Sequence, residues 1–208
     1  MFSSAIQRLN ERRSATGDVG EDSGFTLIEL MVVLLILAIL LAIAIPTFLG
    51  VTKSANDRAT QSNLNTALIN AKSVFQQNSQ SYNLTTNATY TTPAAVMAAT
   101  LLAAEPSLSF GTGTVSSGSA PAQISVAIAP DGNGVILAAQ AKGTGTCWYV
   151  FDNSIAEGAA GPYTALTGAP LTSGTAYGEA KAATTCTAAS PPAPSATVSY
   201  LESGFPSL

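Results

Sequence analysis

Few side chains in this 208-residue sequence could build a catalytic or metal-binding site. The chain has no histidine, and its two cysteines, Cys147 and Cys186, are far apart and show no CxxC spacing. This set is too small for a structural zinc site, and it excludes acid–base or triad catalysis that depends on histidine. The sequence therefore predicts no metal ion and no cofactor.

The carboxylates in the second part of the chain form no obvious pair, and no nucleophile–base pair or glycine-rich phosphate loop accompanies them. We expect them to be solvated surface charges. They are Asp57, Glu105, Asp131, Asp152, Glu157, Glu179 and Glu202. The run after Pro130, Asp-Gly-Asn-Gly, has the start of a calcium loop but lacks its later acidic ligands, so a hairpin turn is favoured. An enzyme is not predicted; a membrane-anchored enzyme stays an alternative without candidate residues.

The charge of the chain is low and slightly negative. Charged residues make up 10% of it, apolar residues 47%, and the net charge is −4. Binding to nucleic acid phosphates requires a basic surface that can release counterions, so no specific nucleic acid partner is predicted.

Much of the apolar excess lies in residues 25–49, and the stretch 30–45 contains no polar residue at all. As a helix, residues 25–49 would extend about 37 Å, which is enough to cross a hydrocarbon core of about 30 Å. A buried core helix is the alternative, but a segment that is apolar on every face suits lipid or a helical bundle better.

A cleaved secretory signal peptide is a second alternative, because Ala42-Ile43-Ala44 resembles a small-residue cleavage site. The apolar segment is longer than a usual signal-peptide core, and the residues just before it, 20–24, are acidic where such a peptide is basic. Upstream arginines at positions 8, 12 and 13 retain some positive-inside bias. These features favour an anchor.

Glu29 is the one carboxylate near the start of the apolar segment. Placing a carboxylate in a membrane helix costs about 3 kcal/mol even on lenient scales, so such a residue usually marks a partner or a function. The alternative is an interfacial glutamate that only touches lipid headgroups, since Glu29 lies about one helical turn from Phe25.

Gly24 is followed by the run FTLIELMVV, residues 25–33. This stretch resembles the prepilin processing motif of type IV pilins and their relatives. The resemblance implies that a prepilin peptidase cleaves after Gly24 and N-methylates the new N-terminal residue, Phe25. It also implies that Glu29 meets the N-terminal amine of a neighbouring subunit during filament assembly, and that Pro46 corresponds to the helix-bending proline of the family.

The expected ion pair has a physical reason. Cleavage would remove the acidic flank and create an ammonium group at Phe25, and in an apolar bundle that cation and the Glu29 carboxylate of another subunit would satisfy each other. An unpaired buried ion costs several kcal/mol, so the pair could set the register of a helical polymer. Pro46 has two readings of its own, a kink or a residue at the lipid boundary.

Beyond Gly50 the helical pattern turns amphipathic and persists to about residue 81, which predicts one helix of about 50–55 residues. We expect a short helix over 93–104, a surface loop over 107–120, and strands over 123–129, 135–141 and 146–151. Residues 197–201 could add a last strand to a loop-rich tail that begins at Asp152.

Together these elements predict an α+β fold, in which one very long N-terminal helix packs on a small antiparallel sheet. Its parts are a leader at 1–24, an apolar transmembrane or filament-core helix at 25–49, an amphipathic continuation at 50–81 and a globular head at 82–208.

The two cysteines are expected to pair if this domain is exported, closing a C-terminal loop; two free thiols in a cytosolic protein are the alternative. A disulfide-closed C-terminal loop also resembles the pilin family.

The resemblance implies a structural subunit of a type IV pilus, with the peptidase, other pilin subunits, the pilus assembly machinery and membrane lipid as partners. It implies a single-pass protein of the cytoplasmic (inner) membrane that becomes part of an extracellular pilus. A pseudopilin of a type II secretion system and a minor pilin share the motif and stay open. A binding module on an uncleaved anchor, in which residues 1–24 persist, is a further alternative.

Overall fold

The computed structural model of the chain describes residues 25–115, 123–155, 173–183 and 185–206. The chain divides into two compact units, Met1–Phe48 and Leu49–Leu208. We call the second the head unit and describe each unit by itself. The predicted leader, residues 1–24 with Gly24, lies outside the described residues.

One helix, α2, runs over 51 residues from Leu27 to Gln77, which confirms the predicted long N-terminal helix. Every residue from Phe25 to Gly50 is exposed, although the segment is almost wholly apolar. Among the described residues α2 is the one helix whose length and composition would allow it to cross a membrane. An apolar surface of this extent needs lipid or other protein to cover it.

Pro46 lies inside α2, which continues through it. Proline has no amide hydrogen, so one hydrogen bond of the helix is missing here. The hydroxyl of Thr47 donates to the carbonyl oxygen of Ile43 at 3.0 Å beside this gap. The kink stays a prediction.

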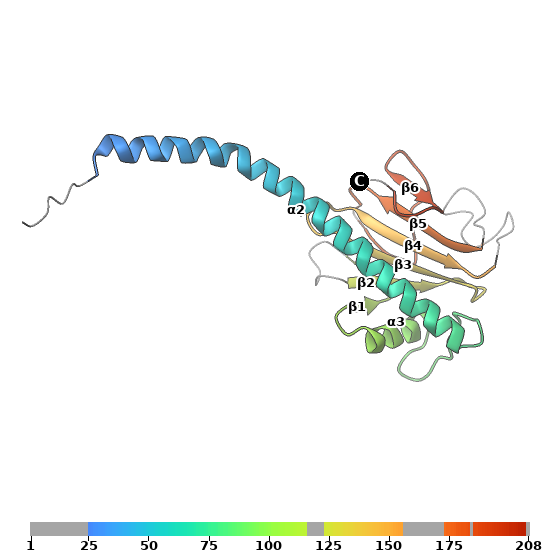
Figure 1. Ribbon diagram of the computed structural model, residues 1–208. Helices are drawn as coiled ribbons and strands as arrows, with labels where there is room; N and C mark the ends of the chain where they lie inside the picture. The colour runs from blue at the N-terminus through green and yellow to red at the C-terminus, as the bar shows by residue number, and fades with distance from the viewer. Residues whose placement is uncertain (1–24, 116–122, 156–172, 184, 207–208) are drawn as a thin grey trace, which may run out of the picture. The chain divides into compact units, whose positions relative to one another are not determined.

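The head unit contains a six-stranded sheet with the strands in sequence order (Figure 1). Its strands are β1 (Ser109–Gly111), β2 (Gln123–Ile128), β3 (Gly134–Gln140), β4 (Cys147–Asn153), β5 (Gly174–Ala180) and β6 (Val198–Leu201). All neighbours pair antiparallel except β1 and β2, which are parallel. The predicted α+β class and antiparallel meander are confirmed.

Two strands lie where the sequence predicted loops. β1 falls within the expected surface loop 107–120, and β5 falls within the expected loop-rich tail. The sequence of β5, GTAYGEA, contains two glycines and few β-branched residues, so its own propensity for a strand is weak. Its conformation comes from pairing with β4 at seven successive positions, which local sequence does not reveal.

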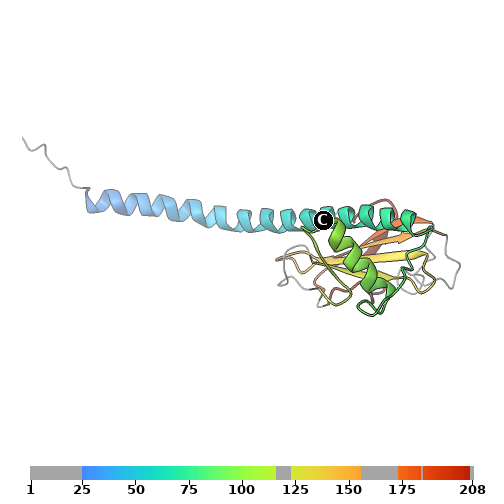
Figure 2. The ribbon, with the colours of Figure 1, turned by 90° about the horizontal axis from the view of Figure 1, so that it is seen from below.

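Within the described part of the head unit, α2 lies over one face of the sheet, and α3 (Pro93–Ala104) crosses the sheet's β1 edge and packs on the same core (Figure 2). The buried stripe of α2 packs there with α3 and with alternate residues of the strands. This core contains Leu64, Ala67, Leu68, Ala71, Met97, Leu101, Ile124, Val126, Leu137, Trp148 and Val150. Small residues at two of four stripe positions of α2 let the helix backbone approach the sheet closely.

The opposite face of the sheet is buried by the segment that follows β5. The residues that alternate with those of the first core gather here, including Ile136, Ala138, Tyr149 and Phe151. Burial raises the pKa of Tyr149 to about 12. Both faces of this sheet are therefore covered, one by helices and one by irregular chain.

The disulfide Cys147–Cys186 joins the start of β4 to this covering segment, and it confirms the predicted pairing. The amide of Val115 donates to the carbonyl oxygen of Cys186 at 2.7 Å, so a third segment is held at the same place. The covering segment has little regular structure of its own; the crosslink ties it to β4, and the amide of Ala188 ties it to β2 by donating to Oγ of Ser125 at 3.0 Å.

Replacing both Cys147 and Cys186 by alanine should lower the free energy of unfolding by roughly 4 kcal/mol, because the crosslink closes a loop of 39 residues. The measurement is urea unfolding in detergent, followed by the fluorescence of Trp148, the single tryptophan. Reduction of the unaltered protein should cause a similar loss. An unchanged unfolding midpoint would contradict a structural role for the bond.

Candidate assembly site

The first turn of α2 is closed by a reciprocal pair of hydrogen bonds between Thr26 and Glu29. The helix begins at Leu27, so Thr26 is its N-cap residue and Glu29 its third residue. The amide of Glu29 donates to Oγ1 of Thr26 at 3.2 Å. Oε2 of Glu29 accepts from the amide and the hydroxyl of Thr26, at 2.9 and 2.8 Å. This is a capping box, which satisfies amides that the helix itself leaves unpaired.

The capping box fixes where the carboxylate lies. It holds Glu29 over the N-terminal end of α2, where the helix dipole favours negative charge. Phe25, immediately before the cap, is 89% exposed. Within the described part of the chain, all bonds of the carboxylate go to Oε2, so Oε1 can accept from another donor.

The structure brings together two of the residues that the sequence singled out, Phe25 and Glu29, at one end of α2. Gly24 precedes the described residues. Pro46 lies further along the same helix, and the disulfide belongs to the head unit. Thr26 was not among the predicted site residues, although the spacing Thr-x-x-Glu before an apolar run is a local signal for a capping box.

Two polar joints hold α2 to the sheet inside the head unit. At the first joint, Oδ1 of Asp57 accepts from Nε1 of Trp148 at 2.9 Å and from Oγ1 of Thr144 at 3.0 Å. One residue earlier, Nδ2 of Asn56 donates to the carbonyl oxygen of Lys142 at 2.9 Å. Asp57 is 4% exposed, so these donors replace water around its carboxylate.

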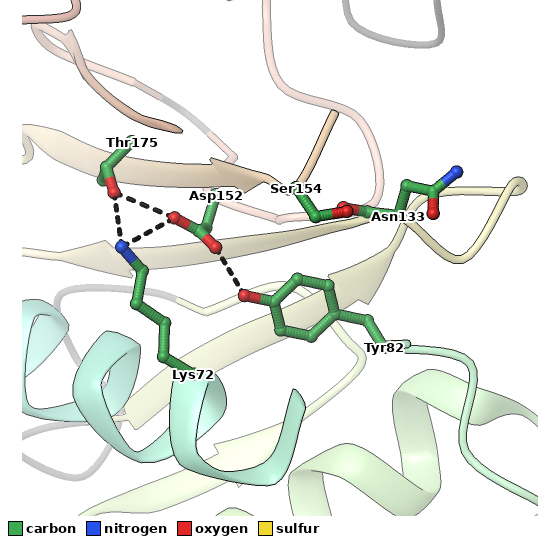
Figure 3. Close-up of polar contacts among 6 residues, drawn as sticks. All are labelled: Lys72, Tyr82, Asn133, Asp152, Ser154 and Thr175. Atoms are coloured by element: carbon green, nitrogen blue, oxygen red, sulfur yellow. Dashed lines mark hydrogen bonds and ion pairs between the residues drawn. The ribbon is translucent and has the colours of Figure 1, made fainter. Parts of the chain in front are cut away.

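The second joint is centred on Asp152 of β4 (Figure 3). Its Oδ1 lies 2.8 Å from the ammonium nitrogen of Lys72 and accepts from the hydroxyl of Thr175 at 2.9 Å. Its Oδ2 accepts from the hydroxyl of Tyr82 at 2.5 Å. Lys72 also donates to Oγ1 of Thr175 at 2.8 Å. One carboxylate thus joins α2, the loop after it and two strands.

These joints correct an expectation. The sequence predicted solvated carboxylates, but Asp57, Asp152 and Glu179 are buried, with at most 7% of each residue exposed. Oε1 of Glu179 lies 3.1 Å from the ammonium nitrogen of Lys181. The donors for Asp57 and Asp152 stand 70 or more residues away in the chain or on other strands, so sequence spacing could not reveal them.

Comparison with known proteins bears on the N-terminal segment. The family model for the prokaryotic N-terminal methylation motif matches residues 21–45. The chain is 44% identical over 59 residues to the type IV wide pilus major component PilA4 of Thermus thermophilus. This chain is type IV pilin-like. The similarity covers 28% of this chain and 44% of the relative, so the pilin-like chain spans less than half of that protein's length. No solved structure matches it.

Asp152→Ala should destabilise the pilin-like head more than Lys72→Met does. Removal of the carboxylate leaves the hydroxyls of Thr175 and Tyr82 without their acceptor and Lys72 without its counter-ion, which should cost about 3 kcal/mol. Lys72 is 45% exposed in its side chain, and methionine keeps its stem, so that change should cost less than about 1 kcal/mol. Urea unfolding of both variants measures the difference. Equal losses would show that the ion pair, rather than the buried hydrogen bonds, dominates the joint.

Proposed function

We propose that the protein is a structural subunit of a type IV pilus. In this proposal the chain is cleaved after Gly24, N-methylated at Phe25 and polymerised through the first half of α2. The observation that carries it is the end of α2: a carboxylate held at the start of a helix whose residues 30–49 expose mostly apolar side chains.

The exposed apolar surface of α2 requires a covering in every state of the protein. Residues 25–49 cannot remain in water, because an apolar surface of this size requires lipid or protein around it. A membrane would cover it before assembly, and the helices of other subunits would cover it in a filament. Since both surroundings are apolar, transfer from one to the other need not expose the segment to water.

Glu29 would give this polymer its register. Cleavage would place a new ammonium group at Phe25, and the free Oε1 of Glu29 in a neighbouring subunit would accept from it. Within an apolar bundle neither charge would be stable alone, so only arrangements that pair them are favourable. The methylation motif over residues 21–45 supports this assignment of roles.

The parts of the chain follow from this proposal. Residues 1–24 would be the removed leader, 25–49 the membrane and filament-core helix, 50–81 its amphipathic continuation and 82–208 the globular head. The precursor would be a single-pass protein of the cytoplasmic (inner) membrane, and the subunit would end on the cell surface. Its partners would be the prepilin peptidase and methyltransferase, other pilin subunits, the assembly machinery and membrane lipid.

The N-terminus of the mature protein tests the processing step. Intact mass and N-terminal sequencing should give a chain that begins at methylated Phe25, abundant in filaments sheared from the cell surface. The same terminus confined to the membrane fraction would favour a pseudopilin or a minor pilin. A chain that begins at Ile45, or one that keeps Met1 in its functional form, would contradict the proposal.

Glu29→Gln separates the charge of this residue from its capping role. Glutamine keeps an oxygen that can accept from Thr26, so the capping box is retained while the anion is lost. We expect normal processing and membrane insertion but at least about tenfold fewer filaments, since an unpaired ammonium would remain in the core. Electron microscopy and quantification of sheared filaments measure this.

Thr26→Ala is the matched control. It removes the hydroxyl of the capping box, which costs about 1 kcal/mol of helix stability, but it leaves the charge of Glu29 in place. Filaments should therefore still form. Filaments from Glu29→Gln together with none from Thr26→Ala would mean that the cap, and not an ion pair between subunits, is what assembly requires.

A further inference from the structure

The positive charges of the head unit are unevenly placed. Beyond the leader the chain has five lysines and arginines, and Lys72 is bound in the second joint. The other four gather at the opposite end of the sheet. We call this set the basic end: Lys53, Arg58, Lys142 and Lys181, all exposed.

Hydrogen bonds bring the basic end together from three segments. Lys142 stands in the turn between β3 and β4, and its carbonyl oxygen accepts from Asn56 of α2, three residues after Lys53. The amide of Ala183, two residues after Lys181, donates to the carbonyl oxygen of Gly145 in the same turn at 3.0 Å. Nε2 of Gln140 donates to both of these loops, at 3.1 and 2.9 Å.

Two carboxylates at this end, those of Asp57 and Glu179, are buried, whereas Glu105, which stands just before β1 at this end of the sheet, is half-buried. Asp57 binds Trp148 and Thr144 within the first joint and is 4% exposed. Glu179 is 5% exposed and pairs with Lys181 through one oxygen. Four exposed cations therefore stand against one half-buried carboxylate, so the solvent-facing charge of the basic end is mainly positive. Asp131, at the far end of β3 from Lys142, is exposed in the turn before that strand.

The basic end lies where α2 enters the head unit. The unit begins at Leu49, Lys53 follows four residues later, and Arg58 follows nine residues later in the same continuous helix. At 1.5 Å per residue these positions are about 6 and 13 Å along the helix from Leu49, the last apolar residue of residues 25–49. A negatively charged membrane surface attracts cations within about one Debye length, roughly 8–10 Å, a range that includes Lys53 and ends short of the backbone position of Arg58.

We propose that the basic end binds the anionic phospholipid headgroups of the membrane that holds residues 25–49. The proposal rests on the proposed function only for the membrane location of that segment. Before assembly the cations lie against the headgroup layer and restrict the head to one orientation on the bilayer. The interaction is electrostatic, so salt and neutral lipid abolish it.

The full chain in lipid nanodiscs provides the test. Discs of phosphatidylcholine alone are compared with discs that contain about 30% phosphatidylglycerol. The rate of lysine acetylation is read at each site by mass spectrometry, with Lys72 as the internal reference. We expect Lys53 and Lys142 to react at least about threefold more slowly in the anionic discs, Lys72 to be unchanged, and about 0.5 M salt to remove the difference.

A double substitution separates binding from mere closeness to a charged surface. In Lys53→Gln/Arg58→Gln, Lys142 should lose its protection, because the remaining cations no longer hold the head on the lipid. In the control Thr85→Glu/Thr86→Glu, which changes the net charge equally at exposed positions away from the basic end, the protection of Lys142 should persist. Unchanged protection of Lys142 in the double-glutamine variant would overturn the proposal.

Other outcomes point elsewhere. Equal acetylation rates in both kinds of disc, with the chain inserted, would overturn the headgroup site and leave the filament proposal intact. Protection that is independent of lipid charge but rises with the number of chains per disc would assign the basic end to a contact between subunits. Failure of the chain to insert in any disc would overturn the membrane anchor itself, and the headgroup site with it.

Discussion

The rotational setting of α2 about its own axis is the constraint on which the rest of the head unit depends. Within the head the helix buries one stripe, built around Leu64, Leu68 and Ala71, against the sheet and α3. The other side carries exposed polar residues such as Ser62 and Asn65. A rotation of the helix would expose the stripe and bury the polar side of the helix. The contacts between α2 and the strands can therefore form at only one rotational setting of the helix.

Apolar packing alone would hold that setting weakly. A stripe of leucine and alanine can be moved along a sheet by one turn, about 5.4 Å, and still bury a similar apolar area. The two joints make such a shift costly, because Asp57 must meet the indole of Trp148 and Lys72 must meet Asp152. A slip would leave carboxylates buried without donors, a cost of several kcal/mol. We infer that the joints specify position more than they add stability.

The elements that the sequence predicts well are those whose pattern is local. The length of α2, the hairpin of β2 and β3, and the disulfide all follow from periodicity, from the turn after Pro130 and from the count of cysteines. β5 could not be predicted from its own sequence, because its conformation depends on pairing with β4. The burial of the carboxylates could not be predicted either, since a solvated and a buried aspartate look alike in sequence until a distant hydrogen-bond donor is known. Thr26 is different, because the spacing Thr-x-x-Glu before an apolar run is a local signal that the sequence does contain.

The capping box also explains how a carboxylate can be tolerated at the start of an apolar helix before assembly. In a chain without partners, the Glu29 carboxylate is already satisfied by the amide and hydroxyl of Thr26 and by the helix dipole. Its cost in an apolar layer is thus reduced before any subunit arrives. In the proposed filament the ammonium group of another subunit would donate a hydrogen bond to Oε1 of Glu29, while Oε2 keeps its bonds in the capping box. Assembly would then gain the full ion pair while the helix start stays intact.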